Sequence, residues 1–379
     1  MKKVLHLIHG LNAGGAEALV TNYFLNFKNN KISYTLLCLE HRRECLFESI
    51  LEDSGVDLLY VEDYLPFKNN TNRVCKLINR LARRIIVRKI IRQKDPDIIH
   101  THLKINSFLR FVRPRCDTII IITVHSDPNK IWGGEGSKRD YYAVNWLIRH
   151  YKTFFVVLHN EMMSIIHEIF DVSNTMILNN GVDVERIRLA KNRERLRREL
   201  KISESAFVMG HVGRFSYVKN QDFLVDIFIE IAKIKGNAFL LMVGDGPDKG
   251  KIIKKLENNG LGGKYLILSN RNDVPDLLTI MDVFIFPSLY EGLPLSLIEA
   301  QVARKPCFIS DAINKYADIS NLITRLSLQQ EAKEWSETIL SYKKPKRIIV
   351  NDEEWDIKKI TKKLEDIYLK VLEERNEKK

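Results

Sequence analysis

Apolar runs of strand length alternate with helix-length segments from the start of the chain to about Phe308. A first series of expected strands covers residues 4–8, 34–39, 58–61, 98–101, 118–124 and 154–158. A second series covers residues 207–212, 238–243, 265–268, 283–286 and 306–310. Strands that alternate with helices predict parallel sheets built from right-handed crossovers. The pattern therefore predicts an α/β protein with two doubly wound domains.

Two segments stand outside this alternation. Residues 183–204 are charged, helical in pattern and without a strand-like run, so we interpret them as a connector. Residues 353–379 predict one charged amphipathic helix with Trp355, Ile360, Leu364, Ile367 and Val371 on its apolar side. We therefore expect domains of residues 1–182 and 183–352, followed by a final helix of residues 353–379. Ligands of open parallel sheets bind beyond the carboxyl ends of the strands, which predicts a site in the cleft where the two domains face each other.

Composition narrows the class of protein. The five cysteines are odd in number and contain no C-x-x-C pair, which argues against a disulfide framework or a zinc site and favours a cytoplasmic protein with reduced thiols. No apolar run approaches the length of a membrane span. The basic, apolar start imitates a signal peptide, but His6, His9 and a following glycine-rich turn favour a first strand. The formal charge of +12 implies an anionic partner: nucleic acid, acidic lipid or a phosphorylated substrate.

A glycine-rich loop follows the first expected strand. Gly14 and Gly15 would let the backbone approach a ligand, and the next helix would present free N–H groups to phosphate. The alternative is a tight turn that binds nothing.

Histidines end two strands of the first series. His100 and His102 are two residues apart and share one face of a strand, and His125 follows the next strand. A metal pair would need a third ligand, and none is visible at a plausible spacing. We expect cleft-lining or structural histidines here.

Two cations follow the first strand of the second series. Arg214 comes just after residues 207–212, and Lys219 comes just before a helix, so both would converge where a diphosphate binds. A solvated surface pair is the alternative. Further along, a strand at residues 283–286 leads into a loop that carries Glu291, and a helix begins near Pro294. Glu299 then lies one turn into this helix. Carboxylates at these places can accept hydrogen bonds from sugar hydroxyls, although Glu291 could also cap the helix and Glu299 face solvent.

These motifs resemble those of glycosyltransferase family 4, the retaining nucleotide-sugar enzymes of the GT-B fold. The matching elements are Gly14-Gly15-Ala16-Glu17, His100-Thr101-His102, Asn180-Gly181-Val182-Asp183, Gly213-Arg214 with Lys219-Asn220, Gly244-Asp245-Gly246-Pro247, and Glu291 with Glu299. They occur in the family's order and span nearly the whole chain. The stretch from Pro306 to Trp335 resembles the exopolysaccharide or capsule branch of the family.

The resemblance implies two Rossmann-like domains facing a central cleft, with the C-terminal helix crossing back to pack on the N-terminal domain. The N-terminal domain would bind the acceptor, and the C-terminal domain the nucleotide-sugar donor. The expected catalytic residues are His125 against the donor sugar, Arg214 and Lys219 on the diphosphate, and Glu291 on the sugar hydroxyls. Expected donor-binding residues are Gly14, Gly15, Asn270, Arg271, Gly292, Leu293, Leu295, Ser296 and Glu299, with Glu299 on the ribose and Asn270 and Arg271 in the base loop. His100 and His102 would lie on the acceptor side.

The implied reaction transfers a hexose or N-acetylhexosamine from a UDP-sugar to a saccharide or lipid-linked acceptor, by front-face attack, with no cofactor and no metal. The Asp95-Pro96-Asp97 triplet imitates a metal motif, but it introduces a strand at the end opposite the expected cleft and is interpreted as a turn. The chain departs from the family pattern at Pro294 and Ser269, where glycine is usual, and beyond Asp311, where Tyr316 and Ala317 stand near the usual acidic position.

A basic helix is predicted at residues 73–94, which contain nine lysines and arginines and no acids. Lys76, Arg80, Arg84, Arg88 and Arg92 recur every four residues and form one stripe; Leu77, Leu81 and Ile85 are expected to pack on the sheet. The stripe is either a solvated helix face or a surface for an acidic membrane leaflet that presents the lipid-linked acceptor, at the inner face of the plasma membrane.

Two other functions compete with this one. A nucleotide-sugar epimerase or hydrolase of the same fold would need no acceptor. A nucleic-acid-binding protein would explain the charge, but the chain shows no aromatic-interleaved basic motif, so no nucleic-acid partner is expected.

Overall fold

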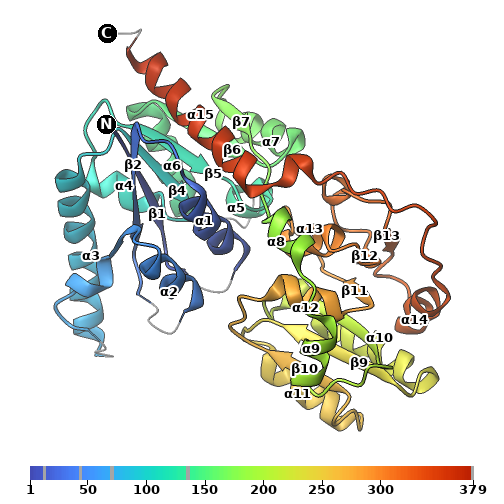
Figure 1. Cartoon of the computed structure of the whole chain (residues 1–379). Helices are drawn as coiled ribbons and strands as arrows, with labels where there is room; N and C mark the ends of the chain where they lie inside the picture. Colours follow the sequence, from blue (N-terminus) through green and yellow to red (C-terminus); the bar gives the residue numbers. More distant parts are fainter. Residues whose placement is uncertain (12–13, 42–44, 69–71, 134–136, 377–379) are drawn as a thin grey trace. The chain divides into compact units, whose positions relative to one another are not determined.

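The computed structural model describes the whole chain except residues 12–13, 42–44, 69–71, 134–136 and 377–379. The chain divides into two compact units (Figure 1). One consists of Met1–Asn12, Ala16–Asn180 and Ile357–Lys379, and the other of Ala13–Gly15 and Gly181–Asp356. Both contain a parallel sheet covered by helices, as the alternating pattern predicts.

The first unit has a seven-stranded sheet in the order β3-β2-β1-β4-β5-β6-β7. Its strands are β1 (Lys2–Ile8), β2 (Ile32–Cys38), β3 (Asp57–Tyr60), β4 (Ile98–His102), β5 (Ile119–Thr123), β6 (Thr153–Val157) and β7 (Thr175–Ile177). Its helices are α1 (Gly15–Asn26), α2 (Leu46–Asp53), η1 (Val61–Tyr64), α3 (Arg73–Lys94), α4 (Ser107–Val112), α5 (Pro128–Trp132), α6 (Lys138–His150), α7 (Asn160–Phe170) and α15 (Ile357–Asn376). The central strands β4 to β6 are buried along their whole length, as strands covered on both faces require.

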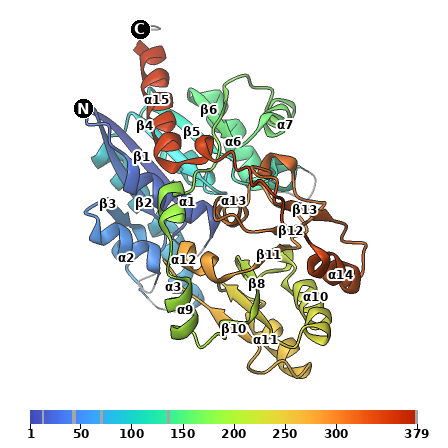
Figure 2. The same cartoon turned by 45° about the vertical axis from the view of Figure 1, so that its right-hand side comes forward.

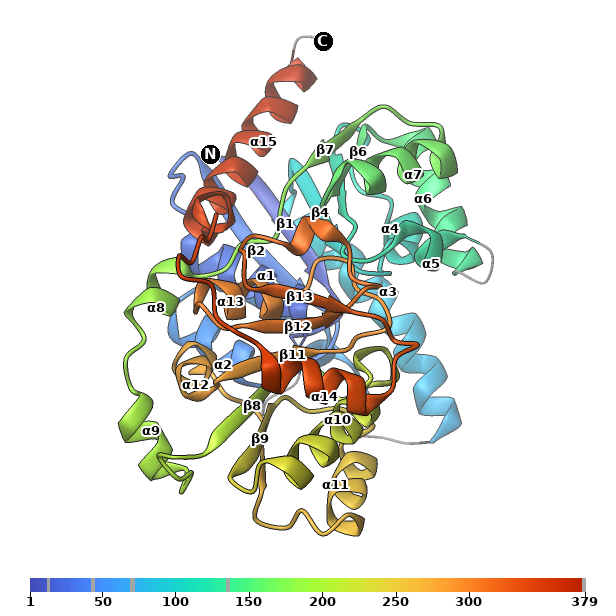
Figure 3. The same ribbon diagram turned by 90° about the vertical axis from the view of Figure 1, so that its right-hand side faces the viewer.

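The second unit has a six-stranded sheet in the order β10-β9-β8-β11-β12-β13. Figure 3 shows the strands from β13 to β9 one beside the next. Its strands are β8 (Phe207–Val212), β9 (Ala238–Val243), β10 (Tyr265–Leu268), β11 (Val283–Phe286), β12 (Cys307–Ser310) and β13 (Ile323–Leu326). Its helices are α8 (Val184–Leu189), α9 (Arg193–Glu199), η2 (Tyr217–Lys219), α10 (Gln221–Ile234), α11 (Lys249–Asn258), α12 (Val274–Ile280), α13 (Leu295–Val302), η3 (Lys315–Ala317), α14 (Ala332–Ser341) and η4 (Glu353–Trp355). The charged connector is helical, as predicted, and consists of α8 and α9.

Two short strands have no counterpart in the sequence-based prediction. β7 has three residues and is not fully buried, and β13 has four residues, one of them Arg325. Both lie at a sheet edge, where a strand needs neither length nor a continuous apolar run because one of its sides has no neighbour.

The C-terminal helix belongs to the first unit, where α15 lies beside β1 and β4 (Figure 2). Glu365 is the main polar anchor: its carboxylate accepts hydrogen bonds from the backbone N–H groups of Lys28 and Asn29 and from the Tyr34 hydroxyl, at 2.8–3.0 Å. Arg375 donates to Asp97 at 2.7 Å. Asp97 therefore has a structural partner, and its triplet lies in the short segment between α3 and β4.

The basic helix α3 has the predicted bounds, but the predicted burial of Leu77, Leu81 and Ile85 is wrong. These side chains are 58%, 52% and 69% exposed. The buried residues of α3 are Val87, Ile90 and Ile91, all in its second half. A helix of 22 residues is about 33 Å long, whereas the strands of this sheet have at most seven residues, or about 23 Å. The helix is therefore longer than the strands of its sheet, and the apolar residues of its first half are not covered by any part of the chain that the structure describes.

Among the described residues, no helix combines the length and the apolar character that crossing a membrane would require.

Candidate functional site

Two glycines bring two loops of the second unit into direct backbone contact. Gly244 and Gly246 follow β9 with φ of +150° and +155°, a region that other residues rarely adopt. A Cβ at Gly244 would lie 2.1 Å from the carbonyl oxygen of Gly213, and one at Gly246 would lie 2.2 Å from that of Phe215. The loop after β9 therefore packs directly against the backbone of the loop after β8, and only glycine fits at position 244 or 246.

A buried histidine and a glutamine also hold the loop after β8 through hydrogen bonds. His211 Nδ1 lies 2.9 Å from the Ile285 carbonyl, and burial lowers the pKa of His211 to about 4, so its ring is neutral and donates to that carbonyl. Gln221 donates to the carbonyl of Arg214 at 2.8 Å and lies 3.2 Å from the second nitrogen of His211. The backbone at Arg214 is thus fixed by side chains from β8 and α10.

The structure brings Lys219 and Glu291 together. The Lys219 ammonium lies 2.7 Å from the Glu291 carboxylate and 4.8 Å from the centre of the Phe286 ring. The two loops are also joined through their backbones, because Leu289 N–H donates to the Val218 carbonyl at 2.8 Å. Arg214 is exposed and has no ion-pair partner among the residues that the structure describes. The site therefore contains one cation that is already neutralised and one that is available to an anion.

The helix α13 begins at Leu295, directly after Pro294, as predicted. The amides of Leu295 and Ser296 stand in its first turn, where N–H groups have no acceptor within the helix. Gly292 and Leu293 belong to the loop that leads into this turn. This helix start can bind an anion beside the Lys219–Glu291 pair.

Glu299 lies one turn into α13, as predicted, and is partly buried. Loss of hydration raises the pKa of Glu299 to about 7, and the charge of Arg186 acts in the opposite direction. A carboxyl group that changes its protonation state near neutral pH can both accept and donate a hydrogen bond, which suits a ligand that carries neighbouring hydroxyls.

The expected base loop follows β10. Arg271 is held by Asp273 through its Nε, at 2.7 Å, and through a second nitrogen, so its side chain is engaged within its own loop. Asn270 has a positive φ of +53°. Ser269, which replaces the usual glycine of the resembled family, donates to the Gly244 carbonyl at 2.9 Å and accepts from Lys249 at 2.8 Å. Ser269 thus ties the base loop to the glycine loop.

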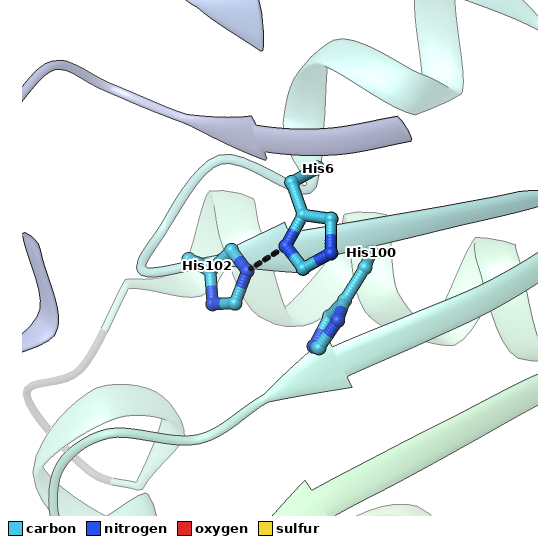
Figure 4. A group of neighbouring side chains, drawn as sticks. All are labelled: His6, His100 and His102. Carbon is cyan, nitrogen blue, oxygen red and sulfur yellow. Dashed lines mark hydrogen bonds between the residues drawn. The ribbon is translucent and has the colours of Figure 1, made fainter. Parts of the chain in front are cut away.

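In the first unit, His6 of β1 joins the two histidines of β4 in a buried cluster (Figure 4). Parallel pairing places His6 opposite His100, and His6 Nδ1 lies 3.0 Å from His102 Nε2. The Tyr368 hydroxyl of α15 lies 2.9 Å from His6 Nε2 and 2.6 Å from His100 Nδ1. Burial first, and neighbouring histidines second, lower the pKa of His6, His100 and His102 well below 6.5, so the three rings are neutral.

The expectation that His100 and His102 lie on the acceptor side conflicts with this arrangement. Both are fully buried. The second nitrogen of His100 lies 2.6 Å from the Thr123 hydroxyl, and that of His102 lies 3.1 Å from His125 Nε2. With both ring nitrogens engaged in the interior, neither side chain can contact an acceptor, and the structural role is the correct one.

A third potential metal ligand, which the sequence did not reveal, is present. His6, His100 and His102 each offer a ring nitrogen, and these three atoms lie within 4.8 Å of one another. All six ring nitrogens of the cluster are within hydrogen-bonding distance of a partner. A metal ion would have to replace some of these hydrogen bonds, so the donor set fits a hydrogen-bonded cluster better than a metal centre.

His125 is the outermost member of this network and is partly exposed. Its Nε2 is held by His102, whereas its Nδ1 has no hydrogen-bond partner among the described residues. Burial lowers the pKa of His125 to about 4, so the ring is neutral, and its unpaired Nδ1 is itself buried. Of the predicted histidines, His125 alone is partly exposed and keeps a ring nitrogen without a hydrogen-bond partner among the described residues.

The glycine-rich loop is described in part. Gly15 begins α1, and a Cβ there would meet nothing within 4 Å. Gly14 precedes it, while Asn12 and Ala13 lie outside the described residues. The predicted site residues thus fall into two sets, each built within one unit. Residues of the second unit gather on the loops after β8, β10 and β11, at the carboxyl ends of the strands, where open parallel sheets bind ligands.

Comparison with known proteins agrees with this architecture. Residues 13–186 match the model of the family described as glycosyltransferase family 4, and residues 192–349 match that of glycosyl transferases group 1. The chain is 30% identical to a Bacillus subtilis (strain 168) protein named as glycosyltransferase EpsF, over 89% of this chain and 87% of that protein.

Two further similarities concern named activities or ligands of other proteins. The chain is 30% identical, over 69% of its length and 70% of the other, to the Escherichia coli UDP-Gal:alpha-D-GlcNAc-diphosphoundecaprenol alpha-1,3-galactosyltransferase. Among solved structures, Anabaena HepE in complex with UDP and glucose matches with a TM-score of 0.74 and 15% identity, covering 98% of this chain and 100% of that one. The last similarity concerns the fold. Together these findings show that the chain is a glycosyltransferase of family 4 with the GT-B fold.

Proposed function

We propose that this glycosyltransferase transfers a hexose or N-acetylhexosamine from a UDP-sugar to a lipid-linked saccharide in exopolysaccharide or capsule synthesis, with retention at the anomeric carbon and without a metal ion. The observation that carries the proposal is the grouping of the Lys219–Glu291 pair and the available Arg214 in one unit. The E. coli relative, whose name gives a UDP-sugar donor and a diphosphoundecaprenol acceptor, supports both substrate classes. The structure of HepE in complex with UDP and glucose supports UDP as the nucleotide of the donor.

The chemistry assigned to the site is stabilisation of a departing diphosphate. When the bond between the anomeric carbon and the diphosphate breaks, negative charge grows on the leaving UDP. Arg214 and the first amides of α13 are available to this charge, and Lys219 can turn to it from Glu291. Glu291 then becomes free to accept hydrogen bonds from hydroxyls of the donor sugar. Glu299 binds the ribose, and His125 lies against the donor sugar.

Retention follows if the acceptor hydroxyl attacks on the face from which UDP leaves. The leaving phosphate is then beside the incoming hydroxyl and can take its proton, so no separate protein base is required. Fixed cations and helix amides in a site sheltered from water stabilise the charge without a divalent ion.

Transfer should persist in the presence of EDTA. The expected result is an unchanged rate of transfer of radiolabelled sugar from UDP-sugars to a lipid-linked saccharide, with NMR of the product showing the donor's anomeric configuration. The metal content of the protein should be measured in parallel, because a buried ion at His6, His100 and His102 could resist chelation. Inactivation by EDTA that Mg²⁺ or Mn²⁺ reverses would contradict metal independence. Conversion of the donor sugar without an acceptor would identify an epimerase or hydrolase instead.

We propose further that α3 attaches the enzyme to the inner face of the plasma membrane. Its exposed Leu77, Leu81 and Ile85 lie beside the basic stripe, and a helix with an apolar face and a cationic flank is suited to lie in an anionic lipid interface. Each lysine or arginine near such a surface contributes about 1 kcal/mol.

The enzyme should sediment with vesicles that contain phosphatidylglycerol at low salt and stay in solution with phosphatidylcholine alone. High salt should release it, because charges in water are screened over about 10 Å at 0.1 M. Reversing Arg88 and Arg92 to Glu and replacing Leu77 and Leu81 with Ser should each reduce sedimentation, while UDP binding stays unchanged. Equal sedimentation of wild type and both variants would show that α3 is a solvated helix.

A further inference from the structure

A basic cavity of about 710 Å³ lies within the first unit, and the predicted functions do not account for it. Its walls come from the first half of α3, from η1 and the segment after it, from the segment after β4 and from the start of α6. All its lining residues belong to the first unit. β4 and the strand before η1 end here, so the cavity stands at the carboxyl edge of the sheet, where ligands of such sheets bind.

The cavity carries a large excess of positive charge. Its lining contains seven lysines and arginines and only two acids, Glu62 and Asp140. Arg83 lies 3.9 Å from Glu62, and the Arg84 guanidinium stacks 3.9 Å from the centre of the Phe111 ring. Lys76, Arg80 and Arg139 are exposed and have no acidic partner among the described residues. Three unpaired cations in one cavity suit a ligand with several negative charges and acceptor oxygens, and the two arginines suit phosphate in particular.

Asp140 adds a buried carboxylate to the lining of the same cavity. It is 2% exposed, and one carboxylate oxygen accepts from the Trp132 indole at 2.9 Å and from Asn106 at 3.2 Å. Asn106 is held in turn by the Thr101 hydroxyl at 2.7 Å. The other oxygen, Oδ1, has no hydrogen-bond partner among the described residues. A buried oxygen without a partner costs free energy, and a hydroxyl donor from a ligand would remove that cost.

The exposed apolar row of α3 indicates how the ligand continues. Leu77 and Leu81 each follow directly after a cavity-lining residue, Lys76 and Arg80. Neighbouring residues of a helix are about 100° apart around its axis. The apolar row therefore borders the cationic wall along the same helix. A lipid chain attached to a phosphate in the cavity would meet this row when it leaves.

We propose that this cavity binds the sugar diphosphate head of the lipid-linked acceptor, with the diphosphate on Arg80, Arg139 and Lys76, an acceptor-sugar hydroxyl on Asp140, and the lipid along Leu77 and Leu81. This assignment rests on the proposed glycosyl transfer. It also divides the basic stripe into two parts with different roles. Lys76, Arg80 and Arg84 line the cavity, whereas Arg88 and Arg92 do not.

The test is calorimetric titration of the full chain with a soluble acceptor analogue, octyl N-acetylglucosaminyl diphosphate. The comparison probes are octyl N-acetylglucosaminide, which lacks phosphate, and inorganic diphosphate. Wild type should bind the sugar diphosphate at least tenfold more tightly than either probe. The variant R80Q/R139Q should lose tenfold or more of that affinity. The matched control R88Q/R92Q, on the same helix but outside the cavity, should change it less than twofold. D140N should weaken binding of the sugar diphosphate and leave inorganic diphosphate unaffected.

Binding of UDP to the same preparations separates the two proposals. If R80Q/R139Q binds the sugar diphosphate as well as wild type does while UDP binding is intact, the cavity assignment is wrong. The same holds if wild type binds none of the probes, or if phosphatidylglycerol vesicles displace the sugar diphosphate, which would indicate a general headgroup site. Sugar diphosphate binding that depends on Arg80 and Arg139, in an enzyme that does not bind UDP, would contradict the proposed donor instead. Circular dichroism confirms folding, and both arginines are exposed, so their replacement should not affect it.

Discussion

Replacing Arg214 with Ala should lower kcat about 100- to 1000-fold. Loss of one donor to a developing negative charge costs about 3 kcal/mol in other enzymes. Arg214 is exposed and unpaired among the described residues, so the charge that it would neutralise belongs to the substrate. Lys219, in contrast, is already paired with Glu291 at 2.7 Å. Steady-state kinetics with the UDP-sugar and acceptor measure the effect. Arg214→Lys should retain part of the rate, because lysine keeps the positive charge but lacks the planar guanidinium that binds two phosphate oxygens at once.

The matched control for Arg214 is Arg198→Ala, which removes an exposed arginine of α9 in the same unit. This variant should keep the wild-type kcat. Urea denaturation should give the same midpoint for wild type and both variants, since neither arginine is buried. A folded Arg214→Ala enzyme with undiminished turnover would show that this residue does not act on the leaving group.

Replacing Gly244 with Ala should lower the free energy of unfolding by about 3 kcal/mol, through backbone strain and a steric clash. The new Cβ would lie 2.1 Å from the Gly213 carbonyl oxygen, and the φ of +150° is rarely adopted by alanine. Relief requires that the loop after β9 move away from the loop that carries Arg214. UDP affinity should therefore fall together with stability, and urea denaturation and calorimetry measure the two effects.

Gly250→Ala provides the control. Gly250 lies in α11, has no positive φ, and a Cβ there would meet nothing within 4 Å. Alanine at such a helix position stabilises by about 0.5–1 kcal/mol. If the two variants were equally stable, the close contact between the Gly213 and Gly244 loops would not be required for folding.

The periodicity of the sequence predicted both sheets because their central strands are buried on both faces and read as continuous apolar runs. The loop motifs identified Arg214, Lys219, Glu291 and Glu299 because each follows the end of such a strand. Topology brings strand ends to one edge of a sheet, so a motif and its place along the chain suffice to predict that its residues gather there. Lys219 and Glu291 are 72 residues apart in the sequence, yet they form an ion pair for this reason.

Contacts between distant elements could not be predicted in the same way. His6 carries no motif, and it joins His100 and His102 only because β1 pairs with β4 in one particular register. Tyr368 reaches this cluster from a helix more than 250 residues further along the chain. A single sequence contains no signal for such pairing.

The sequence by itself determined the two α/β units, the bounds of the basic helix and the loops that carry the charged site residues, since these follow from local periodicity and turn chemistry. Only the tertiary structure decided which of those residues are accessible. It buried His100 and His102, left His125 with one ring nitrogen unpaired among the described residues, and exposed the apolar row of α3. It also placed three of the five residues of the basic stripe in the lining of a cavity that contains Asp140. The physical reason is that burial depends on what packs against a side chain. For α3, the strands and helices that could cover it come from elsewhere in the chain.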